Sequence, residues 1–498
     1  MRYLMGIDIG TTSTRAIIIN AATGKLAAEG VAPYPMRTPH PAWAEQDPAD
    51  WVKGAAKAIR VALKKAGKGE ICAVGLTGQM HSSVFLDDKG QVIRPAILWC
   101  DGRTATECDE MTRRVGKQRL LNIARNIALP GFTAPKILWL AKNEPAAFKR
   151  VAKVLVTKDY IRYVMTGVFA AEVSDASGML LLDVAQRRWS PEILHALKIP
   201  EKWLASVFES PEVTGHVSRE GSRIFGLPEG IPVVGGGGDQ AAGAVGNGII
   251  GEGDVTISLG TSGVVFAPSR KPPIATGSSV HAFCHAVPQM WHTMGVMLAA
   301  GGSMQWFRDF LRFEKNKRLS YADINALASK SPPGSAGVVF LPYLTGERTP
   351  YNDPKARGAF VGLTLSHDIT HVARAVMEGV AFGIKDCAGL MRDAGAPMKN
   401  VYISGGGATS DLWRRIIASV IERPVKRLEV DQGPAMGAAL LAGVGARVWP
   451  DVKSATRRAL RVKDETEPRK EDFKKYREMY ERYRALYPGL APYFRSGA

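Results

Sequence analysis

Residues 255–266 read VTISLGTSGVVF, an apolar run that a Gly-Thr turn joins to a second apolar run. The same pattern stands at the start of the chain, where residues 3–19 read YLMGIDIGTTSTRAIII. Alignment of the two turns, at a spacing of 250 residues, pairs Gly10 with Gly260, Thr11 with Thr261 and Thr12 with Ser262. Strand, turn and strand at matching places predict two similarly built domains that face one another.

The segments around each turn indicate an α/β fold. In the first half a third strand is expected at 25–30, a helix at 49–65 and a buried strand at 71–77. In the second half strands are expected at 282–284, 291–297, 338–341 and 400–404, and helices at 300–311, 371–392, 411–421 and 434–445. Because the opening meander cannot be parallel, the sheet is expected to be mixed. The predicted domains span 1–245 and 246–498, the second with an appended C-terminal helix.

The composition is that of an ordinary globular protein. Of 498 residues, 46% are hydrophobic and 22% are charged, and the chain is too long for one core. The formal net charge of +18 suits nucleic acid, an acidic membrane or small anionic ligands. The basic residues are spread along helical patterns such as 51–65 and 473–484, without a concentrated basic tract that carries aromatics. The sequence therefore argues against nucleic acid as a partner.

Cysteine usage and apolar runs bear on location. The five cysteines are scattered without a CxxC pair, which indicates reduced thiols in a cytoplasmic protein. An acid, Asp8, follows the N-terminus too closely for a signal peptide. The longest weakly apolar stretch, 231–250, contains Asp239 and many glycines, so neither a membrane span nor a membrane partner is expected.

Residues 233–244 read VVGGGGDQAAGA, an apolar lead-in followed by four glycines, one carboxylate and small residues that suit a helix. Four successive glycines let the backbone bend freely and come close to another molecule. Asp239 therefore stands where a group that touches a ligand is well placed. The alternative is that Asp239 only caps the helix, which is a common role for Asp at a helix start.

The two Gly-Thr turns are candidate phosphate sites. A tight turn of this kind presents backbone N–H groups and hydroxyls to one side, and such a concavity binds phosphate oxygens. Two of them could hold the phosphates of a nucleotide from both sides, although each could equally be an ordinary hairpin turn. Asp8 stands just before the first turn, where a carboxylate can hold Mg²⁺ directly or through water. The matching position in the second half is Ser258.

A third glycine turn, SGGGATSD at 404–411, follows an expected strand and precedes an expected helix. Backbone without side chains lets a flat ring lie close to it. The alternative is an ordinary strand-to-helix turn that Ser410 caps.

Other chemistries lack the motifs they need. The chain has no GxxxxGK[ST] sequence, no protein-kinase HRD or DFG set and no GxSxG elbow. Two histidine pairs, His281 with His285 and His367 with His371, have the spacing of zinc ligands on a helix. The first pair lies in a strand-like stretch, where the two rings would start roughly 13 Å apart, and no third ligand stands nearby. Both pairs are therefore interpreted as structural.

Seven stretches carry a resemblance that covers nearly the whole chain. They read GIDIGTTS at 6–13, WAEQDP at 43–48, GQMH at 78–81, AILWCDGR at 96–103, GFTAPKILWL at 131–140, LPYLTGERTP at 341–350, and a spaced pattern from Gly358 to Glu378. With them the chain resembles the FGGY family of carbohydrate kinases, most closely the members that act on D-xylulose. Cys100 departs from that pattern, in which Asn is familiar.

The resemblance implies the fold of the sugar kinase, actin and Hsp70 superfamily, with ATP in a cleft between two ribonuclease H-like domains. It implies Asp239 as the catalytic base and Asp8 as a second essential acid, on the Mg²⁺ side. The sugar contacts it implies are Gln79, Met80, His81, Trp99, Asp101 and Arg103. The ATP contacts are Thr11, Thr12, Gly260, Thr261, Ser262, Gly405, Gly406, Gly407 and Ala408.

The expected reaction is ATP-dependent phosphorylation of D-xylulose at O5. One alternative is a sister kinase that acts on ribulose, glycerol or gluconate. Another is a non-catalytic ATP-dependent binder on the same fold, which would bind nucleotide without releasing ADP in response to sugar. An aromatic stripe on the last helix, which includes Tyr476 and Tyr483, is expected to pack on a domain, with a homodimer contact as the alternative.

Overall fold

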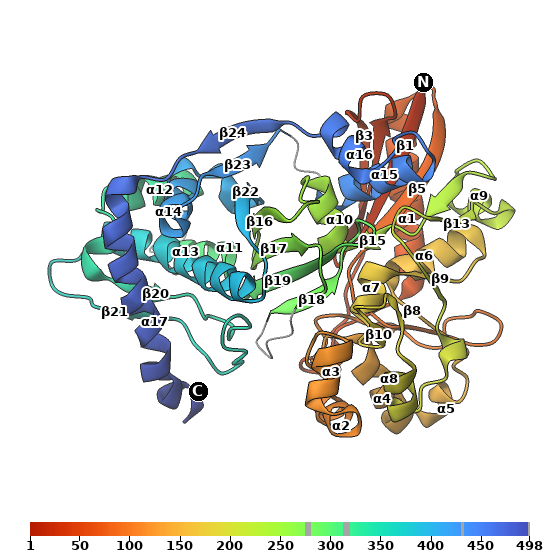
Figure 1. Ribbon diagram of the computed structural model, residues 1–498, viewed down its shortest axis with the longest axis horizontal. Coiled ribbons are helices and arrows are strands. Elements are labelled where there is room, and N and C mark those ends of the chain that lie inside the picture. The colour runs from red at the N-terminus through yellow and green to blue at the C-terminus, as the bar shows by residue number, and fades with distance from the viewer. Residues whose placement is uncertain (274–279, 312–318, 430–432, 497–498) are drawn as a thin grey trace.

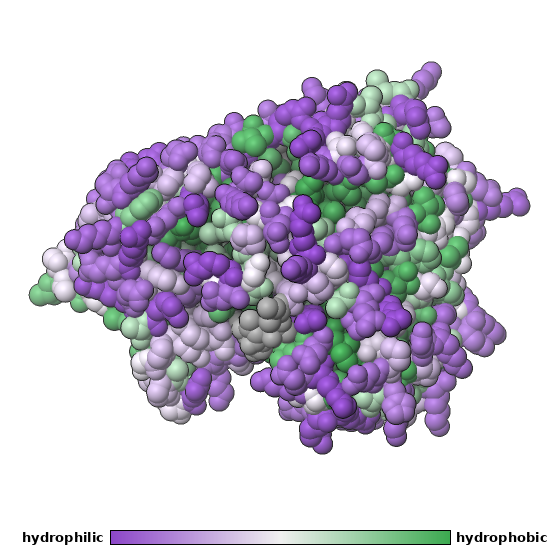
Figure 2. Space-filling view, viewed as in Figure 1, coloured by the Kyte–Doolittle hydropathy of each residue, from purple (hydrophilic) through white to green (hydrophobic). Residues whose placement is uncertain are grey.

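The structure, a computed structural model, describes residues 1–273, 280–311, 319–429 and 433–496. Two lobes lie side by side, each built around one large sheet (Figure 1). Hydrophilic residues cover most of the face drawn in Figure 2. Within the described ranges, no helix is both long and apolar enough to cross a membrane.

The first lobe is built on a sheet with the strand order β13-β14-β5-β1-β2-β3, and β15 also pairs with β5. Its strands are β1 (Arg2–Ile9), β2 (Ser13–Asn20), β3 (Leu26–Pro33), β5 (Glu70–Gly78), β13 (Val213–His216), β14 (Pro232–Val234) and β15 (Gly237–Gly238). β1 pairs antiparallel with β2 and parallel with β5, so the sheet is mixed as predicted. The crossover helix α1 (Pro48–Ala66) begins where the Asp47 side chain accepts a hydrogen bond from the Ala49 N–H, and it buries Trp51 and Ile59.

The second lobe repeats this plan with the strand order β18-β19-β17-β16-β22-β23-β24. Its strands are β16 (Gly253–Leu259), β17 (Gly263–Ser269), β18 (His281–Cys284), β19 (Trp291–Met297), β22 (Met398–Ser404), β23 (Val425–Leu428) and β24 (Val462–Thr466). β16 pairs antiparallel with β17 and parallel with β22, as β1 does with β2 and β5. The repeat predicted from the two Gly-Thr turns is therefore confirmed, and with it the two-domain mixed α/β fold.

Helices and short strand pairs complete the lobes. The helices of the first lobe are α2 (Ala105–Val115), α3 (Lys117–Ile123), α4 (Thr133–Asn143), α5 (Pro145–Phe148), α6 (Thr157–Thr166), α7 (Val173–Ser177), α8 (Pro191–Leu197), α9 (Arg219–Phe225) and α10 (Asp239–Gly246). Those of the second lobe are α11 (Gly301–Phe310), α12 (Tyr321–Ser329), α13 (Ile369–Asp393), α14 (Asp411–Ile421) and α17 (Phe473–Arg495). The short strands are β4 (Glu45–Gln46), β6 (Val84–Leu86), β7 (Ala96–Ile97), β8 (Lys153–Leu155), β9 (Ala170–Glu172), β10 (Leu182–Asp183), β11 (Arg188–Trp189), β12 (Ser206–Phe208), β20 (Val339–Leu341) and β21 (Ala359–Val361).

The last helix, α17, packs on the second lobe. Tyr476 and Tyr483 are 1% exposed and belong to the same apolar core as Phe382 and Tyr343. The hydroxyl groups of Tyr343 and Tyr483 lie 2.8 Å apart and share a hydrogen bond. The aromatic stripe therefore anchors the helix to its own lobe.

Two late helices, α15 (Gly433–Gly445) and α16 (Val452–Ala459), lie against the first sheet instead (Figure 1). A Cβ added at Gly6 would lie 1.9 Å from the carbonyl oxygen of Ala435, and one at Gly75 would lie 2.0 Å from that of Ala438. The absence of side chains at these positions lets α15 rest directly on β1 and β5. The helix predicted at 434–445 is present, and the division of the chain at 245 and 246 stays a prediction.

Candidate active site

Two carboxylates come to the same edge of the first sheet. Asp8 lies on β1 opposite Thr77 of β5, and β15 places Gly237 and Gly238 opposite Thr77 and Gly78 on the other side of β5. Asp239 follows directly, so the backbones of the two acids are about two strand spacings, ~10 Å, apart. The cap interpretation of Asp239 is wrong, because α10 begins at Asp239 and its N-cap is Gly238.

Both carboxylates hold their protons more tightly than a free Asp side chain. Burial raises the pKa of Asp239 to about 6, and hydrogen bonds from Gln240 oppose that rise. Burial raises the pKa of Asp8 to about 7, the charge of Asp239 adds to the rise, and the charge of Arg15 opposes it. Paired acids with raised pKa values are typical of sites that bind a cation or move a proton.

The site fits a hydrated divalent cation beside Asp8. The Oδ1 atom of Asp8 is buried and accepts no hydrogen bond from any described residue. The same residues contain no cluster of three His, Cys, Asp or Glu side chains that could hold a metal alone. Mg²⁺ is commonly held by one or two carboxylates while its other ligands are water and phosphate oxygens, and Asp8 suits that arrangement.

Asp239 opens into a cavity of about 150 Å³ between the lobes. Its lining residues are Met80, His81, Trp99, Leu129, Gly131, Phe132, Asp239, Gln240, Ser262, Val264, His281, Met294, Val296 and Arg348. Three predicted sugar contacts therefore lie here, namely Met80, His81 and Trp99. A mostly apolar lining with a few convergent polar groups is typical of a small-molecule site.

His81 is held in one orientation and in the neutral state. Its Nδ1 atom lies 2.8 Å from the carbonyl oxygen of Gly178, which assigns the proton to Nδ1 and leaves Nε2 as an acceptor. Burial lowers the pKa of His81 to about 3, against the hydrogen bond to Gly178, and the charges of Lys136 and Arg348 lower it further. A neutral ring can accept the hydrogen of a hydroxyl group in the cavity.

Gln79, Asp101 and Arg103 do not line this cavity. The Gln79 Oε1 atom accepts a hydrogen bond from the Thr11 hydroxyl at 3.2 Å, and Trp99 Nε1 donates to the same hydroxyl at 3.0 Å. Asp101 accepts a hydrogen bond from the Ala44 N–H at 2.6 Å and two more from the Arg103 side chain.

The Arg103 guanidinium lies 3.6 Å from the centre of the Trp43 ring and pairs with Glu45 at 2.8 Å. The geometry thus gives Asp101 and Arg103 a supporting role, in which they join the loop that carries Trp99 to the segment around residues 43–45. Gln79 joins the first Gly-Thr turn to the stretch that carries Met80 and His81.

Nine of the lining residues were not predicted as site residues, among them Phe132, His281 and Arg348. Phe132 stacks edge-on against His81, with ring centres 4.6 Å apart, and it also faces His281 from the second lobe. Arg348 is close enough that its charge lowers the pKa of both His81 and His281, and burial lowers its own pKa. No described carboxylate lies within ion-pair distance of its guanidinium. The family-like stretch 341–350 contained the signal for Arg348, a charged pair inside an apolar run.

A larger cavity of about 430 Å³ lies in the second lobe. Its lining residues are Leu259, Gly260, Thr261, Gly301, Met304, Gln305, Tyr321, Asn325, Gly406, Gly407, Thr409, Ser410 and Trp413. Aromatic and aliphatic walls with amide side chains suit a purine ring. The predicted residues Gly260, Thr261, Gly406 and Gly407 lie here.

A further cavity of about 160 Å³, called the passage below, extends from Asp239 between the lobes. Its lining residues are Asp239, Gln240, Gly243, Ala244, Asn247, Thr256, Ser258, Val264, Phe266, Ser404, Gly405, Gly433 and Pro434. Gly405 has φ +85°, and a Cβ there would lie 2.7 Å from the carbonyl oxygen of Leu259, so only glycine suits the position.

The remaining predicted ATP contacts lie partly outside these two spaces, and Thr11 and Thr12 are not among the lining residues of either. Ser262 lines the smaller cavity with Asp239, whereas Ala408 lines a separate space of about 110 Å³ behind Gly405. Thr12 is exposed at the tip of the first turn, and its carbonyl oxygen accepts a hydrogen bond from the Tyr34 N–H at 3.2 Å.

The two histidine pairs noted in the sequence make hydrogen bonds to protein groups. His281 lies on β18, and its Nδ1 atom is 3.2 Å from the amide oxygen of Asn126. His285 Nε2 lies 3.0 Å from the carbonyl oxygen of Ile249, while His367 and His371 bond to turns before α13. Their structural interpretation agrees with these contacts.

Two family models match this chain. The N-terminal domain of the FGGY family of carbohydrate kinases matches residues 3–246, and the C-terminal domain of the same family matches residues 255–446. The chain is 39% identical over 489 residues to a xylulose kinase of Escherichia coli (strain K12), an alignment that covers 98% of this chain and 99% of the relative.

Solved structures agree with this match. The fold superimposes on a xylulose kinase from Rhodospirillum rubrum with a TM-score of 0.92 and 32% identity, covering 99% of this chain and 100% of that one. It superimposes on a gluconate kinase from Lactobacillus acidophilus with a TM-score of 0.91 and 25% identity, covering 98% of each chain.

Proposed function

Because this chain belongs to the FGGY family of carbohydrate kinases, we propose that it transfers the γ-phosphoryl group of ATP to O5 of D-xylulose. The products are D-xylulose 5-phosphate and ADP. One observation carries the proposal. Asp239 lines both the 150 Å³ cavity and the passage that leads to the Gly405 turn, so one carboxylate stands between the acceptor space and the phosphate space.

In this proposal Asp239 is the general base. The primary hydroxyl at O5 donates a hydrogen bond to its carboxylate, and the proton passes to the carboxylate as O5 attacks the γ-phosphorus. The bond between the γ-phosphorus and the β,γ-bridging oxygen breaks, and ADP leaves with that electron pair. A pKa of about 6 leaves Asp239 mostly ionised at neutral pH while its basicity remains above that of a free Asp.

The other groups of the site position the two substrates and offset the charge of the phosphates. His81 Nε2 and the Arg348 guanidinium hold the hydroxyl groups of the sugar, and Trp99 covers one side of it. The N–H groups of the turns at Thr11–Thr12 and Thr261–Ser262 bind phosphate oxygens, and the 405–408 turn contacts the nucleoside. Asp8 holds Mg²⁺, which when bound offsets charge on the phosphate oxygens. The proposal assigns the reaction to the cytoplasm, where ATP is available.

The acceptor is tested with a panel of D-xylulose, D- and L-ribulose, glycerol, gluconate and no sugar, with MgATP and ADP release as the readout. We expect the highest kcat/KM for D-xylulose and a loss of at least ~10²-fold in kcat for Asp239→Ala with ATP binding retained. A higher kcat/KM for another acceptor would assign a sister kinase. Nucleotide binding without sugar-dependent ADP release would assign a non-catalytic binder.

A further inference from the structure

The segment that carries Asp239 has little stiffness of its own. Residues 235–238 are four successive glycines, which lose more conformational freedom on folding than any other residue. Gly236 has φ +73°, and a Cβ there would lie 1.8 Å from the carbonyl oxygen of Leu76. Side chains are therefore excluded by close packing, and the position of Asp239 depends on hydrogen bonds made to the glycine backbone.

Besides the pairing of β15 with β5 and a bond from the Gly235 N–H to the carbonyl oxygen of Glu212 at 2.8 Å, three bonds join the segment to the elements around Ser174, Ser210 and Arg162. Arg162 donates from one guanidinium nitrogen to the carbonyl oxygen of Gly235 at 2.9 Å. The Gly236 N–H donates to the carbonyl oxygen of Ser210 at 2.9 Å. The Gly238 N–H donates to the Ser174 hydroxyl oxygen at 3.0 Å, one residue before Asp239. Both ends of the glycine run are thus fixed.

One carboxylate, that of Glu172, organises these donors and acceptors. It accepts hydrogen bonds from the Ser174 hydroxyl at 2.8 Å, the Ser174 N–H at 2.8 Å and the Ser210 hydroxyl at 2.6 Å. The bonds that it accepts from the N–H groups of Ser174 and Asp175 cap the start of α7. Because the Ser174 hydroxyl donates to Glu172, its oxygen lone pair is directed to the Gly238 N–H.

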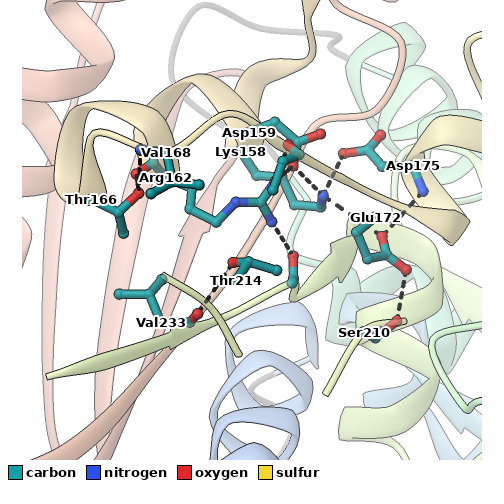
Figure 3. A network of polar contacts seen from close by, with 12 residues as sticks. Lys158, Asp159, Arg162, Thr166, Val168, Glu172, Asp175, Ser210, Thr214 and Val233 are labelled. Carbon is teal, nitrogen blue, oxygen red and sulfur yellow. Dashed lines mark hydrogen bonds and ion pairs between the residues drawn. The ribbon is translucent and has the colours of Figure 1, made fainter. Parts of the chain in front are cut away.

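Two cations hold the carboxylates in place (Figure 3). Lys158 Nζ lies 2.6 Å from Asp159, 3.6 Å from Glu172 and 3.5 Å from Asp175. Arg162 pairs with the same Asp159 oxygen at 2.8 Å. Each of these five side chains is at most 2% exposed.

Asp175 is strongly perturbed by its burial in this cluster. Burial raises the pKa of Asp175 well above that of a free Asp, Lys158 opposes the rise, and the charges of Asp159, Glu172 and Asp239 add to it. Buried ion pairs add little net stability, but they fix one geometry.

From these contacts we infer that Ser174 is a positioning residue for Asp239, and that Glu172, Ser210 and Arg162 hold the glycine run in the conformation that sets the direction of the carboxylate. The inference rests on the proposed role of Asp239 as base. The side chains of this network line neither the 150 Å³ cavity proposed for the sugar (the acceptor cavity) nor the 430 Å³ cavity proposed for the nucleotide. Loss of the network should therefore affect the chemical step more than substrate binding.

The test compares the full-length protein with Ser174→Ala, Ser210→Ala and Ser190→Ala. The control Ser190 is 3% exposed, and its hydroxyl also accepts a backbone N–H, that of Ile193 at 3.2 Å, at the start of α8. All three variants lose a buried serine hydroxyl from the first lobe. Thermal unfolding reports stability, and ADP release with D-xylulose and MgATP reports kcat and both KM values.

We expect Ser174→Ala to lower kcat by ~10–100-fold, because a small misplacement of a catalytic group has an effect of that size. Its KM values for sugar and ATP should stay within about twofold of the wild type. Ser210→Ala should lower kcat by ~3–10-fold, since it loosens only Glu172. Ser190→Ala should unfold at a lower temperature with kcat unchanged. If Ser174→Ala does not fold, the kcat of Ser210→Ala alone tests the inference.

Wild-type kcat in Ser174→Ala and Ser210→Ala would overturn the inference and leave the proposed function standing. An equal loss of kcat in Ser190→Ala would also overturn it, because the loss would then follow from lower stability. Absence of sugar-dependent ADP release by the wild-type protein would overturn the proposed function, and the inference with it.

Discussion

Turnover at saturating D-xylulose and MgATP should fall about tenfold when the pH is lowered from 7 to 5. The magnitude follows from Asp239, whose pKa burial raises to about 6. One pH unit above that value about 90% of the carboxylate is ionised, and one unit below it about 10% is. Only the ionised form can accept the proton of the O5 hydroxyl, so kcat should follow that fraction.

The assay is initial-rate ADP release between pH 5 and 8, with the protein returned to pH 7 after each exposure to show that it remains folded. Asp239→Asn is the matched variant, since it keeps the shape of the side chain and has no carboxylate to titrate. Its small residual rate should change little over the same range. A fall in the rate of ADP release near pH 6 that persists in Asp239→Asn would refute the reasoning. The titrating group would then be another one, such as ATP itself.

Three further outcomes follow from the site. Burial raises the pKa of Asp8 to about 7, so its ionisation opposes folding at pH 8 and this cost fades as the pH falls from 7 toward 4. Asp8→Asn should therefore raise Tm at pH 8 by about 1 °C for each kcal/mol recovered, with a smaller gain at pH 5, and should lose turnover. A lower Tm at pH 8 would contradict this. Arg348→Met should raise the KM for sugar ~10-fold and leave the KM for ATP within about twofold, because Arg348 lines the 150 Å³ cavity and is not among the described residues that line the 430 Å³ cavity. Steady-state kinetics with each substrate varied would show the opposite pattern if Arg348 bound nucleotide. Gly405→Ala should weaken ADP binding ~10-fold by calorimetry, since a Cβ would meet the Leu259 carbonyl oxygen at 2.7 Å and φ is +85°; unchanged affinity would show that the turn does not touch the nucleotide.

The sequence was most informative where the chain makes its own local structure. Two apolar runs joined by a Gly-Thr turn can only form an antiparallel pair, and the repeat of that pair predicted both sheets. The same local logic placed Asp8 at the end of a strand and Asp239 at the start of a helix. The two acids come close together because β1 and β15 both pair with β5. The spacing of the strands along the sequence could not predict this pairing.

The rest depended on contacts between distant segments. Arg348 enters the acceptor cavity from the second lobe, and nothing in its local sequence sets that direction. Arg103 matches a family stretch as well as Trp99 does, yet it stacks on Trp43 behind the cavity, because residues 43–46 return to pair with β7. The Lys158 network was not anticipated at all, since its members become neighbours only through the packing of α6, α7 and the segment before β13.

The helix α15 has a consequence for how the protein is made. During synthesis β1, β2, β3 and β5 leave the ribosome long before residues 433–445, and until then the face of the sheet around Gly6 and Gly75 lacks its cover. The first lobe can therefore finish folding only after the second lobe has largely been translated. A truncated chain that ends after α10 would leave this apolar face open to aggregation, whereas one that also carries residues 433–459 would have it covered.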